Sequence, residues 1–218
     1  MDYAAYIRAE WQGFLDDPNR ALASREAVAG RSVTAVLDVG CGAGQELIPF
    51  QGPGVLRVGL DVSPNLGCVP WDADHESPTF IRGNGDSLPF AEASFDVVIC
   101  RGALPYLDSR LALREMARVL RPRGVLLLKI VSATCMLREL RRGLASFDLG
   151  RSVHAAHLLV GGGVHLLLGV RPKTPFTRYG VQPERLLARE LDRVGLRIVR
   201  PMPDSHRLGP SFLIEKRG

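Results

Sequence analysis

Lysine is almost absent from this chain, although the chain is basic. Lysine and arginine together number 28, yet lysine stands only at Lys129, Lys173 and Lys216. No run of basic residues exceeds two, and the net charge of +5 is spread over 218 residues. Proteins that bind nucleic acid more often carry dense clusters of lysine and arginine. The charge pattern therefore does not favour a nucleic-acid partner, and the arginine bias is typical of a GC-rich coding sequence.

Cysteine is also scarce, and its spacing matches no metal motif or disulfide framework. An acidic turn at residues 72–76 (DADHE) contains four side chains that could bind metal, but consecutive positions in a loop are better explained as solvated charge. We therefore expect no metal site, and we expect the cysteines that fall in apolar segments to be small buried thiols. The four cysteines lie far apart, at Cys41, Cys68, Cys100 and Cys135.

No uncharged apolar run is long enough to cross a bilayer. The first residues are acidic and aromatic, whereas a signal peptide begins with basic residues followed by an apolar run. A hydrophobic content of 46% and a charged content of 23% are ordinary for a globular protein, and 218 residues can bury a substantial core. The expectation is one cytoplasmic domain over residues 1–218.

A glycine-rich turn follows a short apolar run in residues 34–46 (TAVLDVGCGAGQE). The first six of these residues are rich in β-branched side chains, which is typical of a strand buried on both faces. Gly40, Gly42 and Gly44 then permit a sharp turn and a close approach of a ligand to the backbone. The chain next starts a helix that a proline cuts short. This arrangement aims backbone N–H groups at a nucleotide-like ligand, and a plain tight turn is the alternative interpretation.

A second apolar run, residues 55–60, ends in Asp61. An acid at the tip of the second strand, about twenty residues past the glycines, is where a carboxylate holds the two hydroxyls of a ribose. The ionised carboxylate accepts both in charge-assisted hydrogen bonds. A carboxylate that merely opens a turn is the competing interpretation.

An ordered set of motifs extends over about residues 33–131. After VLDVGCGAG and GLDVSP come GDSLPF (85–90), SFDVVIC (94–100) and RVLRPRGVLLL (118–128). This set resembles the class I S-adenosylmethionine-dependent methyltransferases, most closely the type 11 group. The resemblance implies an α/β, doubly wound, Rossmann-like fold with a seven-stranded, mostly parallel sheet and an antiparallel last strand. A nicotinamide-binding fold would more often show Gly-x-Gly-x-x-Gly.

The remaining periodicity agrees with an α/β chain. Residues 1–30 are predicted to form a helical cap, with Tyr3, Tyr6, Trp11 and Phe14 near one face. The helix that usually follows the second strand is predicted to be reduced or absent, because two prolines interrupt the sequence there. Further strands are predicted at 79–82 (near an edge), 95–101, 125–131, 196–200 and 211–216, and helices at 109–120 and 183–194.

Residues 132–180 are predicted to be an insertion before the last helix. A helix is expected at 136–149, followed by an uncharged, glycine-centred stretch at 155–170. That stretch would form either a hairpin with a three-residue loop or two short helices with a hinge. Insertions at the carboxyl ends of the strands line the ligand crevice, so we interpret this one as a lid over the substrate. Its apolar character suits an apolar substrate or a partner subunit, and a core role for 155–170 stays open.

The resemblance also implies residues that contact the methionine and ribose portions of the cofactor. The three glycines of the turn would bring the backbone close to it. Asp38 would fix the turn and bind the amino group, directly or through water, although it could instead cap the following helix. Asp61 would hold the ribose hydroxyls, and Arg101 would lie where the backbone meets the cofactor near its methyl group.

For the adenine, the resemblance implies contacts from the second and third motifs. Val62 would pack on the ring, and Asp86 would accept a hydrogen bond from the adenine amino group. Ser87 and Leu88 would border the ring. A plain turn role is the alternative for Asp86.

The resemblance implies direct displacement at a sulfonium methyl, which depends mainly on alignment and requires no dedicated acid or base. Many relatives carry a histidine after the fourth strand, whereas residues 102–106 read GALPY here. The candidates for a catalytic side chain are Tyr106, His154 and His157, and ordinary packing or surface roles compete with each.

We therefore expect methyl transfer from S-adenosylmethionine to a small-molecule acceptor at an oxygen, nitrogen or carbon nucleophile. Methylation of RNA or protein is one alternative. A partner protein that binds the cofactor without catalysis is another, because no base is evident. The sequence does not fix the substrate or the oligomeric state.

Overall fold

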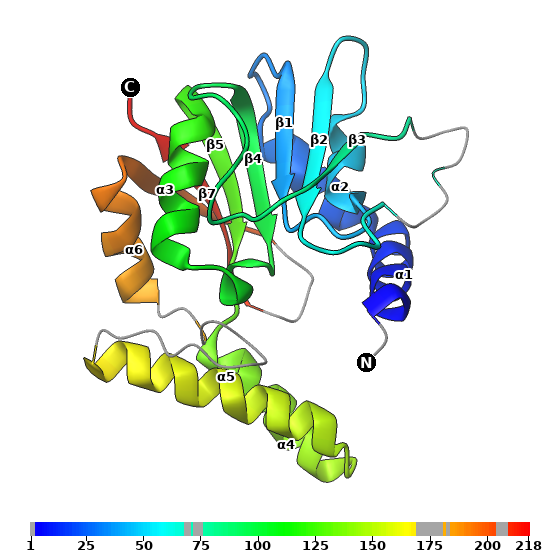
Figure 1. Cartoon of the computed structure of the whole chain (residues 1–218), viewed down its shortest axis with the longest axis vertical. Helices are drawn as coiled ribbons and strands as arrows, with labels where there is room; N and C mark the ends of the chain where they lie inside the picture. Colours follow the sequence, from blue (N-terminus) through cyan, green and yellow to red (C-terminus); the bar gives the residue numbers. More distant parts are fainter. Residues whose placement is uncertain (1–2, 68–70, 72–75, 169–180, 182–183, 204–208) are drawn as a thin grey trace.

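A seven-stranded sheet runs through the computed structural model in the order β3-β2-β1-β4-β5-β7-β6 (Figure 1). Strands β1 to β5 pair in parallel, and β7 lies antiparallel between β5 and β6. The predicted fold class, with its antiparallel last strand, is confirmed. The strands are β1 (Ala35–Val39), β2 (Leu56–Asp61), β3 (Thr79–Arg82), β4 (Phe95–Arg101), β5 (Leu120–Lys129), β6 (Leu196–Met202) and β7 (Ser211–Lys216).

The structure describes residues 3–67, 71, 76–168, 181, 184–203 and 209–218. Its α-helices are α1 (Tyr3–Leu15), α2 (Pro18–Ala27), α3 (Ser109–Val119), α4 (Ala133–Ala145), α5 (Leu149–Leu168) and α6 (Glu184–Arg193). Two short 3-10 helices are η1 (Gln45–Phe50) and η2 (Leu104–Tyr106). Within these residues no helix is both long and apolar enough to span a membrane.

Two apolar layers enclose the sheet. Helices α3 and α6 pack with alternate residues of β1, β4, β5 and β7 on one face, whereas α2 and η1 pack on the other. All five residues of β1 are buried, which explains why this strand reads as a continuous apolar run broken only by Asp38. The edge position predicted for residues 79–82 is confirmed, since β3 pairs only with β2 among the described strands.

The N-terminal cap consists of two helices because Asp17 and Pro18 start a new one. The Asp17 side chain accepts a hydrogen bond from the backbone N–H of Asn19, and proline is suited to the first helical turn. Trp11 and Phe14 are buried, as their spacing predicts, and pack in a cluster near the glycine turn. The side chains of Tyr3 and Tyr6 lie outside the described part of the structure.

Some predicted bounds shift. Strand β5 begins at Leu120, five residues earlier than predicted, because Leu120 pairs with Phe95 across an irregularity in the register and is fully buried. The described residues between β2 and β3 form turns and loops, which agrees with a reduced helix there. Most of the acidic turn, residues 72–75, and Cys68 lie outside the described residues.

The prediction for residues 155–170 is wrong in both of its forms. A single 20-residue helix, α5, runs through the three glycines and packs antiparallel against α4. The glycines act as contact points instead of hinges. A Cβ at Gly162 would lie 2.2 Å from Val181 Cγ2 and 3.0 Å from its carbonyl oxygen, so the chain can return alongside the helix only if residue 162 is glycine. A backbone hydrogen bond from Val181 N–H to Leu158 O, 3.2 Å, fixes this contact.

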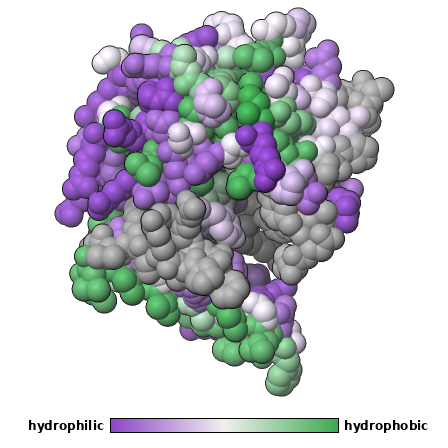
Figure 2. Space-filling view, viewed as in Figure 1, coloured by the Kyte–Doolittle hydropathy of each residue, from purple (hydrophilic) through white to green (hydrophobic). Residues whose placement is uncertain are grey.

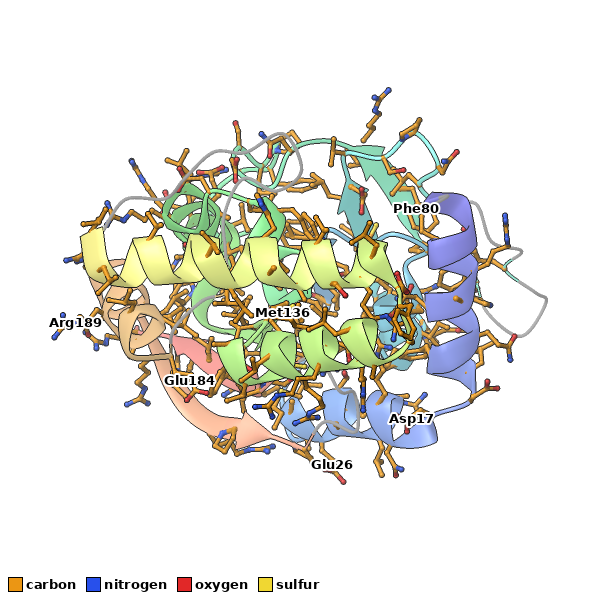
Figure 3. All side chains as sticks on the ribbon, turned by 90° about the horizontal axis from the view of Figure 1, so that it is seen from below. Asp17, Glu26, Phe80, Met136, Glu184 and Arg189 are labelled. Atoms are coloured by element: carbon orange, nitrogen blue, oxygen red, sulfur yellow. The ribbon has the colours of Figure 1, made fainter. Side chains whose placement is uncertain are left out.

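The α4–α5 pair lies across the carboxyl ends of the parallel strands. In Figure 1 it crosses below the sheet, and Figure 3, seen from below, shows the two helices side by side in front of the strands. Helix α4 follows β5 after three residues, which places it at that edge. That the pair acts as a lid over the substrate stays a prediction.

We predict opposite effects from adding a methyl group at two adjacent glycines of α5. Gly162→Ala should lower the free energy of unfolding by about 1–3 kcal/mol, because the new Cβ overlaps Val181. Gly163→Ala meets nothing within 4 Å and should raise it by about 0.5–1 kcal/mol through helix propensity. Urea unfolding of both variants tests this, and equal effects would show that the contact with Val181 is unimportant.

Candidate cofactor site

The glycine turn after β1 adopts a backbone that other residues rarely reach. Gly40, Gly42 and Gly44 have φ values of +75°, +53° and +84°, all in the left-handed region. A Cβ at Gly40 would also lie 2.2 Å from the Cβ of Ala103, in the loop after β4. The sequence expectation that these positions require glycine is therefore supported by both conformation and space.

Two buried carboxylates stand on either side of this turn. Asp61, at the end of β2, accepts a hydrogen bond from Gly42 N–H at 3.0 Å and another from Ser63 N–H at 2.8 Å. Asp61 therefore fixes the glycine turn through Gly42. Its bond to Ser63 also opens the turn after β2, which is the alternative that the sequence left open for this residue. Asp38 is 2% exposed, and its Oδ2 has no hydrogen-bond partner among the described residues. It does not cap η1, whose N-cap is Gly44 and has no side-chain cap.

Burial raises the pKa of Asp38 well above its ordinary value, and the nearby carboxylates of Glu46 and Asp61 raise it further. The guanidinium groups of Arg101 and Arg20 oppose this pKa shift without cancelling it. Asp38 therefore stays protonated to a higher pH than an ordinary aspartate.

Glu46 joins two buried arginines from distant parts of the chain. Arg20, on α2, donates from Nε to Glu46 Oε1 at 2.6 Å and also pairs with that oxygen through Nη2. Arg101, at the end of β4, has its Nε 3.5 Å from Glu46 Oε2. The side chains of all three residues are at most 6% exposed. We call Arg20, Glu46 and Arg101 the ionic cluster.

A cavity lies between the glycine turn and the ionic cluster. Its accessible volume is about 60 Å³, and Ile7 and Glu10 of α1 close one side of it. The oxygens Asp38 Oδ2, Gln45 Oε1 and Glu46 Oε2 are buried here with no hydrogen-bond partner among the described residues. Buried acceptors without donors are costly, so the cavity is suited to a polar, charged ligand group.

The residues predicted to meet an adenine lie at the ends of β2 and β3. Val62 is 68% exposed directly after Asp61. Asp86 is half-buried and accepts a hydrogen bond from Asp108 N–H at 2.8 Å, so one of its oxygens anchors the start of α3. Ser87 is exposed, whereas the Leu88 side chain is buried in the core and its N–H donates to Glu115.

None of the candidate catalytic side chains is among the described residues that line the cavity. Tyr106, on η2, is half exposed, and burial raises its phenol pKa, so it is protonated at neutral pH. His154 and His157 lie on α5. Burial lowers the pKa of His154, as does the neighbouring His157.

The cysteines near the site are not reactive thiols. Burial, together with the nearby Asp38 and Asp61 carboxylates, raises the pKa of Cys41, and burial with Asp38 raises the pKa of Cys100 to about 12. Both are buried, as expected from their segments. The described residues contain no grouping of His, Cys, Asp or Glu that could hold a metal ion.

The sequence analysis missed four polar residues that line the cavity: Glu10, Arg20, Gln45 and Glu46. Gln45 and Glu46 follow the glycine turn directly, so a polar pair at the start of a buried helix was a usable signal. Arg20 had no such signal, because α2 reaches the cavity only through tertiary packing.

Sequence comparison matches residues 37–128 to a family described as a methyltransferase domain. The chain is 35% identical over 103 residues to an uncharacterized methyltransferase, YcgJ, of Bacillus subtilis, covering 45% of this chain and 41% of the relative. It is 34% identical over 128 residues to a malonyl-[acyl-carrier protein] O-methyltransferase of Dechloromonas aromatica, covering 57% of this chain and 46% of the relative. The chain thus spans under half the length of either curated relative.

The fold is shared with solved structures. One is 1,6-didemethyltoxoflavin-N1-methyltransferase of Burkholderia thailandensis, with bound 1,6-didemethyltoxoflavin and S-adenosylhomocysteine. The TM-score is 0.62 at 16% identity, over 100% of this chain and 86% of that one. The family match begins inside β1 and ends inside β5, so the part of this chain that contains the glycine turn and the parallel strands is similar to a methyltransferase domain.

Proposed function

We propose that this chain binds S-adenosylmethionine at the glycine turn and transfers its methyl group to a small-molecule acceptor. The observation that carries the proposal is the glycine turn itself, with three left-handed glycines held between buried Asp38 and Asp61 at the carboxyl ends of β1 and β2. Ligands of open α/β sheets bind at this edge, where the strand order reverses. Here the reversal falls between β1 and β4.

The cavity fits the amino-acid end of the cofactor. A methionine moiety carries an ammonium and a carboxylate, and the cavity offers both partners. Asp38 and Glu46 present buried acceptor oxygens to an ammonium, and Arg20 and Arg101 present guanidinium groups to a carboxylate. We propose that the carboxylate competes with Glu46 for the two arginines.

The adenosine would then extend toward the ends of β2 and β3. The two backbone N–H groups that Asp61 accepts occupy one position on each of its oxygens, and a carboxylate has about four acceptor positions. We propose that Asp61, at the end of β2, also accepts the two ribose hydroxyls. Exposed Val62 would pack on the adenine, with Asp86 and Ser87 at its edge. The Leu88 side chain is buried, so only its backbone would border the ring.

The cavity of about 60 Å³ is smaller than the roughly 300–1,000 Å³ of typical small-molecule sites. We propose that the ionic cluster and α1 shift when the cofactor enters. Helix α1, through Ile7 and Glu10, would then cover the bound cofactor.

S-adenosylmethionine supplies an electrophilic methyl group on a sulfonium. The chain's own contribution is to align an acceptor with that group and to exclude water. The cysteines near the site are protonated, and Tyr106 at neutral pH can donate a proton but not accept one. The acceptor is therefore proposed to be a nucleophile that needs no strong base from the protein, with His154 and His157 on the covering helix as the remaining candidates.

A small acceptor is favoured by the position of the α4–α5 pair, which covers the carboxyl edge of the sheet and would narrow access for a folded RNA or protein. The fold relative with bound 1,6-didemethyltoxoflavin acts on a small molecule. The D. aromatica relative is named for a malonyl group on a carrier protein. Methylation of RNA or protein, and cofactor binding without catalysis, are the rival functions.

The function is tested by incubating the protein with methyl-labelled S-adenosylmethionine and a cell extract separated into metabolite, RNA and protein fractions. We expect label in the metabolite fraction. Label confined to RNA or protein would favour the first rival. Tight binding with no labelled product in any fraction would favour the second, and a titration with NAD should show no binding.

Asp61→Ala should weaken cofactor binding about ten- to hundredfold, because charge-assisted hydrogen bonds worth about 1.5–3 kcal/mol are lost. Calorimetric titration with S-adenosylmethionine measures this. Asp96→Ala is the matched control, since Asp96 also accepts backbone N–H groups, from Thr34 and Ala35, at the opposite end of the sheet. Unchanged affinity in folded Asp61→Ala protein would overturn the ribose assignment.

Cofactor binding should also release a proton from Asp38. The pKa of this carboxyl is raised in the free protein, and an ammonium beside it would lower that pKa. Affinity should therefore increase with pH up to the raised pKa of free Asp38 and then level off. Titrations in buffers of different ionisation enthalpy measure the released proton, and Asp38→Asn should abolish both effects. A pH-independent affinity in the wild-type protein would contradict the assignment.

A further inference from the structure

Helix α5 is largely apolar, with Ser152 and three histidines as its polar side chains after Arg151, yet the described chain covers only one side of it. Between Arg151 and Leu168 the helix contains no aspartate, glutamate, lysine or arginine. On its inner side, Leu158 and Gly162 pack against α4 and Val181. A helix that is hydrophobic all round is normally buried all round. Its outer side therefore lacks a partner that the sequence anticipates.

The outer side presents one continuous stripe of residues. Their spacing alternates four and three, which is the pattern of a seam between two packed helices. The four large members are 59–82% exposed, and Figure 2 shows hydrophobic residues gathered along the lower edge, where Figure 1 places α5. The outer stripe consists of Leu149, Val153, Ala156, Val160, Gly163 and Leu167.

The turn before α5 extends the same surface. Phe147 is 95% exposed and has a φ of +54°, a left-handed conformation that is a genuine outlier for a bulky residue. Leu144 and Leu168 are also more than three-fifths exposed. A strained backbone that holds a phenylalanine in solvent is explained if the ring packs on another molecule.

The outer stripe is symmetric about position 158. In an antiparallel pair of α5 helices crossing there, Leu149 would face Leu167 of the second copy. Val153 would face Gly163, and Ala156 would face Val160. Each small residue thus meets a larger one, and the two leucines close the ends. Phe147 would lie beside the end of the other α5, close to its Leu168.

We propose that the outer stripe is the interface of a homodimer. In it, two α5 helices pack antiparallel through their outer stripes, about a two-fold axis that crosses the helices at the level of residue 158. A two-fold interface must be self-complementary, and the alternation of large and small residues provides this. Six side chains, Phe147, Leu149, Val153, Val160, Leu167 and Leu168, are 59–95% exposed. Burying them on both copies removes on the order of 1,000 Å² or more, the size at which specific interfaces begin.

A membrane surface fits the stripe less well. Interfacial helices combine an apolar face with a strongly charged opposite face. The opposite face of α5 is packed on α4 and Val181, and it carries no lysine or arginine beyond Arg151. The proposal does not depend on methyl transfer, because it rests on the helix alone.

The test is the molar mass of the full chain by sedimentation velocity at about 1–100 μM. We expect a dimer for the wild-type protein. Val160→Glu should raise the dissociation constant at least about a hundredfold, since two carboxylates would be buried without partners. Leu22→Glu is the matched control, because Leu22 is 52% exposed on α2 and lies outside the stripe. It should leave the dimer intact, and circular dichroism checks that both variants fold.

The orientation is tested by mixing Ala156→Cys chains with Val160→Cys chains under mild oxidation. Antiparallel packing predicts a disulfide between the two different chains, and none when either is oxidised alone. A disulfide within each single preparation would indicate parallel packing and overturn the proposed arrangement.

Three results would overturn the dimer itself. A monomeric wild-type protein over the whole concentration range is the first. A dimer that Val160→Glu leaves unchanged is the second. The third is a monomer that co-sediments with phosphatidylglycerol vesicles, while the Val160→Glu variant does not. That result would assign the stripe to a membrane surface.

Discussion

The structure depends on a carboxylate buried at the carboxyl end of its central strand. Asp38 interrupts a strand that is otherwise wholly apolar and wholly enclosed, and the following glycines turn the chain around it. A lone buried carboxyl group is costly when ionised, so its surroundings have to supply compensation or keep it neutral. The ionic cluster and Asp61 are arranged around this constraint. Two guanidinium groups approach from α2 and β4, and the Asp61 carboxylate fixes the turn that shields Asp38.

The ionic cluster also connects layers that are far apart in sequence. Arg20 lies on the helix pair before the sheet begins, Glu46 follows β1, and Arg101 ends β4. A buried charge network of this kind is strongly destabilised when one member is removed, but it need not add net stability over apolar packing. It does prepare the cavity, because its charges are already held in place and have lost their water. In the proposed complex, the carboxylate of a zwitterionic ligand would replace Glu46 as the partner of the two arginines. Cofactor binding would then be linked to the position of the N-terminal helices, because Arg20 lies on α2.

The α4–α5 pair shows a different use of the same edge of the sheet. Its glycines permit close contacts, at Gly143 against Ser152 and at Gly162 against Val181, and so hold α5 in a fixed place across the strand ends. One side of α5 completes the protein's own packing, whereas the other carries the outer stripe. If the outer stripe joins two copies of the chain, the dimer would hold the α4–α5 pair in one orientation over each site. With this proposed interface, the uncharged character of residues 155–168 would reflect two packing interfaces on a single helix, without requiring an apolar substrate.

Much of the fold and part of the site followed from sequence alone. Buried parallel strands read as apolar runs, and the motif order from the glycine turn to β5 predicted the sheet and its topology, because each motif marks a strand end. The glycine turn follows β1 and Asp61 ends β2, as the sequence predicted, because a left-handed turn and a strand-end acid are local features, whereas their contacts with a cofactor stay predictions. The start of β5 was not predicted correctly, because the pairing of Leu120 with Phe95 is a tertiary contact that no local pattern shows.

What only the tertiary structure decided was which distant residues meet. Arg20 reaches Glu46 through helix packing that no local pattern encodes. The glycines at 161–163 suggested a hinge because glycine is a weak helix former, but close packing against Val181 made a continuous helix the better solution. The sequence determined the strands, the turn and the strand-end acids because these depend on neighbours along the chain. The charged cavity and the continuous α5 depend on contacts across the fold, and so only the folded chain defines them.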